Sequence, residues 1–228
     1  FPEWSADRVR ETTRAAFESL GRTAFETAVL SRYTDAEALT FYDKSDTWHV
    51  AEQAFAKGRG VIFAAGHLGN WELAAAYVGL RFGHVEAVVR MQENPLFDGY
   101  VNRNRERMGI SVVWDGDAVR RVPRALREGH SVYFVMDQGY AGLASIWVPF
   151  FGRLAKTPRG AATFAIREET PIVFIAAIRQ PSGQFAVHFE SIPVQQTGDK
   201  NADVTIGALR VTVPAARDFG VMQIEDDN

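Results

Sequence analysis

Short apolar runs alternate with amphipathic segments along the middle of this chain, and this alternation constrains the fold more than any other feature. Each run is bounded by glycine or polar residues, which is typical of a buried β-strand, and each intervening segment has helical spacing. Strands joined by helices form a parallel sheet that is covered on both faces. The sequence therefore predicts an α/β fold with strands at residues 61–65, 85–89, 110–114 and 131–136 and helices at 71–82, 95–108 and 118–128.

Flanking segments extend this pattern. Residues 6–30 carry apolar side chains near helical spacing after Pro2 and a candidate cap at Ser5, so we expect an amphipathic helix or helix pair there. Helices are also expected at 48–57 and 158–169. Strands are expected at 172–178 and 185–190, joined as a hairpin through Pro181, Ser182 and Gly183. The stretch of about 20 residues after Asp137 is rich in Gly, Pro and aromatic residues, and its length predicts a functional loop.

Composition narrows the chemistry. The chain has 228 residues, of which 46% are hydrophobic and 23% charged, as expected for one globular domain. It contains no cysteine, which excludes disulfides, thiolate metal sites and a cysteine nucleophile. The formal net charge of −3 argues against nucleic acid as a partner. No apolar run is long enough to span a bilayer, no signal peptide is recognisable, and the chain begins at Phe1 rather than Met.

A histidine and a glutamate stand five residues apart in Gly66-His67-Leu68-Gly69-Asn70-Trp71-Glu72. This segment follows the strand at 61–65, at the edge where open α/β sheets bind ligands. On a continuous helix the two side chains would point apart, so a turn must precede the helix if they are to touch. With that turn, Glu72 reaches Nδ1 of His67 and leaves Nε2 as a general base for a substrate hydroxyl. The alternative is a chance pairing of His and Glu.

Other catalytic classes lack their motifs. The sequence has no G-x-S-x-G elbow, no P-loop and no G-x-G-x-x-G. A metal site is not expected, because no H-E-x-x-H is present and the remaining histidines have no companion ligand at a recognised spacing. These histidines are His49, His84, His130 and His188.

Further motifs follow in a fixed order. They are Val89-Arg90, Asn94-Pro95-Leu96, the Arg-x-Arg-x-x-Gly of 105–109, Leu126-Arg127-Glu128-Gly129, Asp137-Gln138, Val148-Pro149-Phe150-Phe151-Gly152 and Thr157. With the His67 segment and the opening Phe1-Pro2-Glu3-Trp4-Ser5, this set resembles the bacterial lipid A biosynthesis acyltransferases, the lauroyl/myristoyl acyltransferase family, including phosphatidylinositol mannoside acyltransferase-like relatives. The resemblance spans residues 1–205.

The resemblance implies a glycerolipid-acyltransferase-like α/β fold, with a mostly parallel sheet and helices on both faces. It implies an O-acyltransferase that moves a fatty acyl group from an acyl carrier protein or coenzyme A thioester to a hydroxyl of an anionic membrane glycolipid, such as a lipid A precursor. No cofactor is expected beyond the thioester co-substrate. The implied location is the cytoplasmic face of the bacterial inner membrane, peripheral in this chain, with the membrane surface as a partner.

The resemblance also implies roles for individual residues. His67 matches the general base and Glu72 its partner, Arg105 the arginine that binds substrate or the oxyanion, and Asp137 the acidic residue of the family's D-[HQ] pair. From the residues alone, Arg105 could instead lie on a solvated helix face, and Asp137 could cap a turn. The residues expected to bind substrate are Asn70, Arg90, Asn94, Arg107, Gln138, Phe150, Phe151 and Thr157.

Two surface features have two interpretations each. The helix at 118–128 places Arg120, Arg121, Arg124 and Arg127 on one face, which suits an anionic membrane or an acidic carrier protein, or a plain solvated surface. An apolar cluster in the long loop suits an acyl-chain wall or a membrane-dipping patch, or core packing. Its members are Trp147, Val148, Phe150 and Phe151.

The chain departs from the family at both ends. Family members usually begin with a hydrophobic helix before the F-P-x-W-S segment and end with a basic tail. We therefore expect one acyltransferase domain at 1–213 without that helix, followed by an atypical acidic tail at 214–228, in a chain shortened at the front and altered after Val213. Two alternatives to the transferase stay open, a non-catalytic lipid-binding or membrane-associating remnant and a thioester hydrolase.

Overall fold

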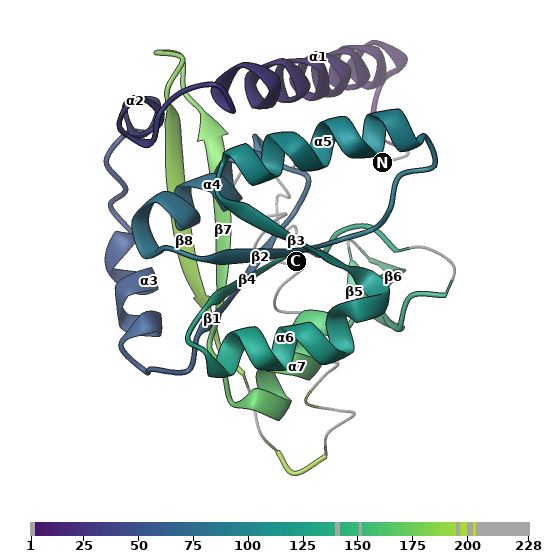
Figure 1. Ribbon diagram of the computed structural model, residues 1–228. Helices are drawn as coiled ribbons and strands as arrows, with labels where there is room; N and C mark the ends of the chain where they lie inside the picture. The colour runs from purple at the N-terminus through teal and green to yellow at the C-terminus, as the bar shows by residue number, and fades with distance from the viewer. Residues whose placement is uncertain (1–2, 140–141, 151, 195–196, 200–202, 204–228) are drawn as a thin grey trace.

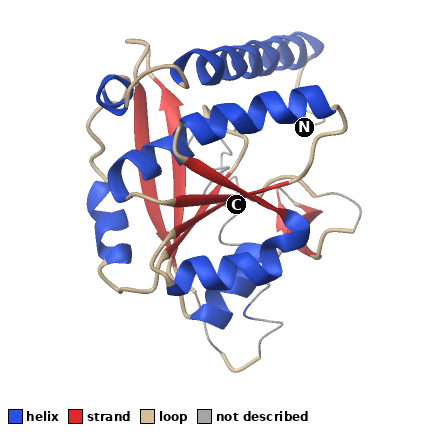
Figure 2. Ribbon diagram, in the orientation of Figure 1, coloured by secondary structure: helices blue, strands red, loops and turns tan. Residues whose placement is uncertain are grey.

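A six-stranded sheet forms the centre of the protein (Figures 1 and 2). The computed structural model describes residues 3–139, 142–150, 152–194, 197–199 and 203, so the expected tail at 214–228 lies outside it. The strand order is β3-β2-β4-β1-β7-β8, and every neighbouring pair is parallel except β7 with β8. The strands are β1 (Val61–Ala65), β2 (Val85–Val89), β3 (Ile110–Trp114), β4 (Ser131–Val135), β7 (Ile172–Arg179) and β8 (Phe185–Ile192).

Helices cover both faces of the sheet. One face packs against α3 and α4 around Phe63 and Phe189, and the other packs against α6 and α7 around Ile62 and Phe174. In Figure 1, α6 and α7 lie below the sheet, and α5 and the long α1 lie above it. The helices are α1 (Ala6–Leu30), α2 (Asp35–Leu39), α3 (Trp48–Phe55), α4 (Trp71–Phe82), α5 (Pro95–Arg107), α6 (Ala118–Arg127) and α7 (Gly160–Glu168). The expected α/β fold is confirmed.

The stretch after Asp137 was expected to be a long functional loop, but part of it has regular secondary structure. It contains a two-stranded antiparallel sheet, β5 (Ser145–Phe150) and β6 (Arg153–Pro158), turning around Gly152. Val148 and Thr157 are buried in this hairpin, whereas Trp147 and Leu154 are more than half exposed. The core interpretation of the apolar cluster therefore holds for Val148 but not for Trp147.

The parallel register determines which loop residues become neighbours. In the β1–β4 pair, Ala65 lies opposite Val135, so segments that follow the two strands meet at the carboxyl edge of the sheet. In the β2–β4 pair, Val85 lies opposite Ser131, so segments that precede these strands meet at the amino edge. The strand β4 thus contributes to both edges.

Helix α1 is a single helix, capped by the Ser5 side chain, which confirms the expected helix rather than a helix pair. Its buried side chains are Thr23 and Thr27, whereas Phe17 and Phe25 are 71% and 76% exposed. Leu30, at its end, packs against the core, but most of its large apolar side chains are exposed. Among the described helices, none is both long enough and apolar enough to cross a membrane.

Candidate active site

A tight turn carries His67 from the end of β1 to the beginning of α4. Gly69 in this turn has a φ of +56°, and a Cβ there would lie 2.1 Å from the carbonyl oxygen of Ala177 on β7. That same carbonyl accepts a hydrogen bond of 2.9 Å from the backbone N–H of Asn70. Only glycine fits so close to a neighbouring strand in this conformation. The turn that the sequence required before the helix is therefore present, and it is anchored to β7.

Asn70 ends the turn and begins the helix. Its side-chain oxygen accepts from the N–H of Leu73, which makes it the N-cap of α4, and the residue is fully buried. Its amide nitrogen donates to Glu26 on α1, and Glu26 in turn accepts two hydrogen bonds from Arg179 on β7. Asn70 was expected to bind substrate, but its buried contacts give it a structural role in holding the turn.

Asp137 is the residue that contacts the His67 imidazole. One carboxylate oxygen lies 2.7 Å from Nδ1 of the ring, and the other accepts the backbone N–H of His67, also at 2.7 Å. The register explains this proximity, because His67 and Asp137 each lie two residues beyond the paired ends of β1 and β4. The Trp71 ring packs edge-on against the imidazole at 4.7 Å between centroids. His67 and Asp137 are about one-third exposed, so the imidazole is fixed and still accessible.

Asp137 is charged in this arrangement. Burial of the carboxyl group alone would raise its pKa, but the hydrogen bonds and the charge of His67 outweigh burial. The pKa of Asp137 is therefore lowered from its ordinary value of 3.8. A carboxylate on Nδ1 places the ring proton there and leaves Nε2 as the nitrogen able to take a proton. Both carboxylate oxygens of Asp137 thus contact His67, while the alternative that Asp137 caps the following turn stays a prediction.

Glu72 is not the partner of His67, and that expectation is wrong. Its carboxylate accepts two hydrogen bonds from Arg105 on α5, from Nε at 3.0 Å and from a terminal nitrogen at 2.6 Å. Both side chains are about 85% buried, and Arg105 also donates to Asn102. Arg105 therefore does not lie on a solvated helix face. Glu72 follows the turn on α4, where its side chain is directed to α5, while the strand neighbour β4 supplies the carboxylate for the imidazole.

The other expected substrate-binding residues are distributed over several elements of the fold. Asn94 caps α5 by accepting from Leu96 and Phe97, and Thr157 is buried in the β5–β6 hairpin. Gln138 directly follows Asp137 and is exposed, as are Arg90 and Arg107. Phe150 is half-buried at the end of β5, and Phe151 lies outside the described residues. None of these residues has a role that the structure tests.

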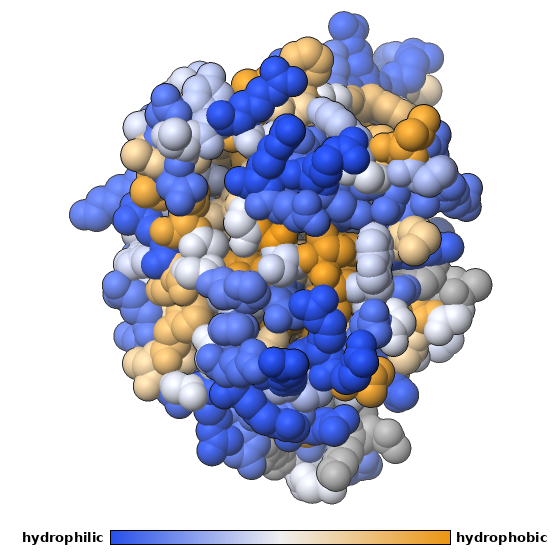
Figure 3. Space-filling view, viewed as in Figure 1, coloured by the Kyte–Doolittle hydropathy of each residue, from blue (hydrophilic) through white to orange (hydrophobic). Residues whose placement is uncertain are grey.

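The arginine face of α6 is neutralised by acidic partners. Each arginine of the face is within salt-bridge distance of one carboxylate: Arg120 of Asp117, Arg121 of Glu86, Arg124 of Glu128 and Arg127 of Glu168. Figure 3 shows this region as hydrophilic. The ion pairs show that it includes both signs of charge. The interpretation of a solvated surface is therefore favoured over a free basic patch.

Most of the chain is similar to known proteins. Residues 1–205 match the family described as bacterial lipid A biosynthesis acyltransferase. The chain belongs to this family. Within the family it is 26% identical over 185 residues to the lipid A biosynthesis lauroyltransferase of Escherichia coli (strain K12), which covers 81% of this chain and 60% of that protein.

Two further relatives are similar. The lipid A biosynthesis palmitoleoyltransferase of Escherichia coli (strain K12) is 27% identical over 151 residues, covering 66% of this chain and 48% of that protein. The phosphatidylinositol mannoside acyltransferase of Mycolicibacterium smegmatis (strain ATCC 700084 / mc(2)155) is 23% identical over 165 residues, covering 70% and 52%. The chain thus spans between 48% and 60% of the length of these three relatives.

Two residues that support the turn at His67 could not be identified from the sequence. Glu26 and Arg179 hold the turn through Asn70, yet they lie 153 residues apart in sequence and belong to no motif.

Within the described residues, one group could hold a metal ion, formed by His84, Glu86 and His130. It lies at the amino edge of the sheet, away from His67, and so belongs to a different place in the fold.

Proposed function

We propose that this protein is an O-acyltransferase that moves a fatty acyl group from a thioester of acyl carrier protein or coenzyme A to a hydroxyl of a lipid A-type membrane glycolipid. The observation that carries the proposal is the contact between Nδ1 of His67 and the Asp137 carboxylate at the carboxyl edge of the sheet. It orients a general base in a chain that has no cysteine nucleophile. Family membership supplies the reaction class.

The reaction then needs no acyl-enzyme. Nε2 of His67 takes the proton of the acceptor hydroxyl as its oxygen attacks the thioester carbonyl, and a tetrahedral oxyanion forms. The C–S bond then breaks, and the departing sulfur takes the proton back from Nε2. Asp137 accepts a hydrogen bond from Nδ1–H throughout, remains a carboxylate, and stabilises the imidazolium between the two transfers.

Glu72 and Arg105 have a positioning role in this proposal. Their paired hydrogen bonds join the beginning of α4 to α5, beside the turn that carries His67. Each of the three guanidinium nitrogens already donates one hydrogen bond, and the two terminal nitrogens each keep another N–H. Arg105 is thus still able to donate to a substrate phosphate or to the oxyanion, as the family resemblance implies.

The lipid acceptor implies work at a membrane surface, and we propose a peripheral position on the inner membrane. Support comes from exposed apolar side chains on α1 and at the beginning of α5. Leu96 is 83% exposed and Phe97 54%, in addition to Phe17 and Phe25. Figure 3 shows hydrophobic side chains near the beginning of α5, and others at the centre of the same face. Such an exposed set is typical of a lipid contact.

The test is a transfer assay on the purified full chain. Lipid A precursor in mixed micelles is incubated with a pool of acyl thioesters on both carriers, and products are identified by mass spectrometry. We expect an acylated glycolipid, its loss in His67→Ala, and its retention in His49→Ala, which changes an exposed histidine on α3. Free fatty acid without acceptor would instead indicate a hydrolase. Saturable lipid binding without any product would indicate a non-catalytic remnant.

A further inference from the structure

Two histidines stand side by side at the amino edge of the sheet. His84 directly precedes β2 and His130 directly precedes β4, and each follows a glycine that ends the preceding helix segment. Because Val85 lies opposite Ser131 in the parallel register, the two histidines occupy equivalent positions on neighbouring strands. Their ring centroids are 4.5 Å apart. A companion metal ligand for either histidine could not be recognised from the sequence, because the two residues are 46 positions apart and only the strand register brings them together.

One ring nitrogen of each histidine faces a carboxylate oxygen at a distance too long for a hydrogen bond. Nε2 of His84 lies 3.7 Å from one oxygen of Glu86, and Nδ1 of His130 lies 3.8 Å from one oxygen of Glu128. Nδ1 of His130 is buried and has no hydrogen-bond partner. The ligand atoms of His84, Glu86 and His130 all lie within 4.8 Å of one another. Around a tetrahedral zinc ion, neighbouring ligand atoms are about 3.3 to 3.6 Å apart, so the three ligand atoms would have to approach one another by up to about 1.5 Å.

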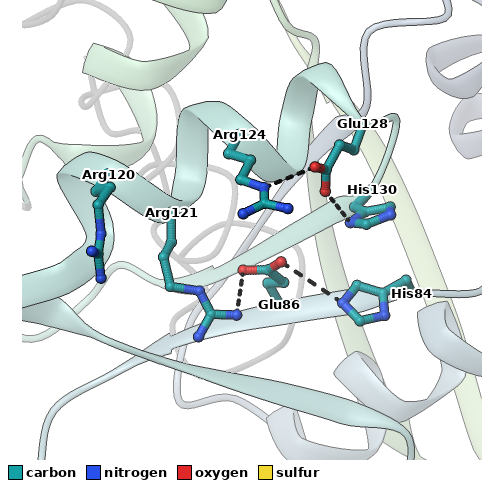
Figure 4. Close-up of a pocket in the computed structure, with 7 residues that line it drawn as sticks. All are labelled: His84, Glu86, Arg120, Arg121, Arg124, Glu128 and His130. Carbon is teal, nitrogen blue, oxygen red and sulfur yellow. Dashed lines mark hydrogen bonds and ion pairs between the residues drawn. The ribbon is translucent and has the colours of Figure 1, made fainter.

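Arginines hold the opposite oxygens of both carboxylates (Figure 4). Arg121 donates to the outer oxygen of Glu86 at 3.2 Å, and Arg124 donates to the outer oxygen of Glu128 at 2.8 Å. Each carboxylate therefore directs its remaining oxygen toward a histidine. Outer hydrogen bonds of this kind orient metal ligands in known sites.

These contacts decide between a cation and an anion as the occupant. The pocket has a volume of about 520 Å³ and includes three arginines, which alone would suit an anion such as phosphate. However, Arg121 and Arg124 already bind Glu86 and Glu128, and Arg120 pairs with Asp117. An anion would have to share these arginines with the carboxylates, whose negative charge would repel it. A divalent cation would instead use ligand atoms that already lie close together, one each from His84, Glu86 and His130.

We propose that His84, Glu86 and His130 bind a divalent transition-metal ion of the zinc type. Two imidazoles and one carboxylate form a ligand set that suits zinc, with water in the fourth position, and the Glu86 carboxylate partly balances the charge of the ion. The ion would join the beginnings of β2 and β4. It lies at the sheet edge opposite His67, so it acts on stability and takes no part in acyl transfer.

The test uses the full chain without an affinity tag, purified, treated with EDTA and titrated with ZnCl₂ by calorimetry. We expect one ion per chain and a higher melting temperature with zinc. His84→Ala and His130→Ala should each weaken binding by at least about tenfold. The matched control His49→Ala changes an exposed histidine on α3 and should bind zinc like the unchanged chain.

Cobalt supplies a second readout. With CoCl₂ we expect the intense visible absorption of a tetrahedral ion, lost in both histidine variants and kept in His49→Ala. Circular dichroism of each variant separates lost binding from lost folding. Zinc binding that is unchanged in both His84→Ala and His130→Ala would overturn the proposal. So would the absence of zinc binding together with a rise in melting temperature on adding inorganic phosphate, which would make the pocket an anion site.

Discussion

Asp137 holds His67 at two points, the backbone N–H and the ring Nδ1, each at 2.7 Å. The backbone contact fixes where the residue lies, and the ring contact fixes which nitrogen faces the substrate. A single carboxylate from the neighbouring strand thus determines both the position and the tautomer of the proposed base.

Asp137→Asn should therefore lower transfer without unfolding the chain. The amide keeps an oxygen for the backbone N–H, but its NH₂ group faces Nδ1 and favours the tautomer in which Nε2 carries the proton and cannot act as a base. We expect kcat to fall by roughly 10²- to 10⁴-fold, with a melting temperature that is lowered only modestly. Transfer rates within about tenfold of the unchanged chain would contradict the assignment of Asp137.

The lowered pKa of Asp137 predicts how stability depends on pH. The group contributes stability above its ordinary pKa of 3.8, and this contribution is lost as pH falls through the lower folded-state value. The difference in unfolding free energy between the unchanged chain and Asp137→Asn should therefore be constant from about pH 5 to 8 and shrink below about pH 4. Urea unfolding at a series of pH values measures it. A difference that grows on acidification would show the opposite sign.

The buried pair of Glu72 and Arg105 should behave as a unit. Removing either partner leaves a mostly buried charge, so Glu72→Ala and Arg105→Ala should each destabilise the fold by about 3 kcal/mol. The double variant should lose less than the sum, because no unpaired charge is left. Denaturant unfolding measures all three, with Arg103→Ala on the exposed side of α5 as the control. If the double variant loses as much unfolding free energy as the two single variants together, the contact between Glu72 and Arg105 contributes nothing to stability.

Position 69 requires glycine for two reasons, the positive φ and the lack of space for a Cβ. Gly183 also has a positive φ, +89°, but a Cβ there meets nothing within 4 Å, so Gly183→Ala should cost only about 1 kcal/mol. Gly69→Ala adds a clash with the carbonyl of Ala177 and should cost clearly more while also reducing transfer. Thermal melting of the two variants makes the comparison. Equal losses in melting temperature for the two variants would show that the strain of a positive φ accounts for the whole effect.

The exposed phenylalanines of α1 should affect membrane association rather than stability. Phe17→Ser combined with Phe25→Ser removes apolar side chains that are 71% and 76% exposed, so the melting temperature should stay within a few degrees. Sedimentation with phosphatidylglycerol vesicles should show several-fold weaker binding. Arg120→Gln with Arg124→Gln is the control, because both arginines are already paired with acids. Weaker binding only in the arginine variant would move the membrane contact to α6.

The elements of the central sheet could be predicted from sequence almost to the residue. The strand Val61–Ala65 and the helix Trp71–Phe82 match their expected bounds, because glycine and asparagine mark their ends and buried parallel strands are uniformly apolar. The β5–β6 hairpin was not predicted, since Lys156 and Arg153 interrupt any alternating pattern in β6. Local patterns reveal elements whose burial is uniform and miss those that lie partly in solvent.

The partner of His67 could not be predicted in the same way. Glu72 is close in sequence and was chosen for that reason, whereas Asp137 is 70 residues away and was assigned a separate role. The choice depends on which strand lies beside β1 and in what register, and one sequence does not contain that information. The same limit hid the pair of His84 and His130, which depends on the register of β2 with β4.

The polar attachment of α1 has a consequence for how the molecule opens. The helix is joined to the turn by Thr23, which donates to the carbonyl of Gly69, and by Glu26, which binds Asn70 and Arg179. Its release would expose little apolar surface, so its amide hydrogens should exchange with deuterium before those of β1 and β4, at a free energy below that of global unfolding. When α1 leaves, the turn that carries His67 loses two of its anchors. Opening of this one helix would therefore disorganise the base while the sheet beneath it stays folded.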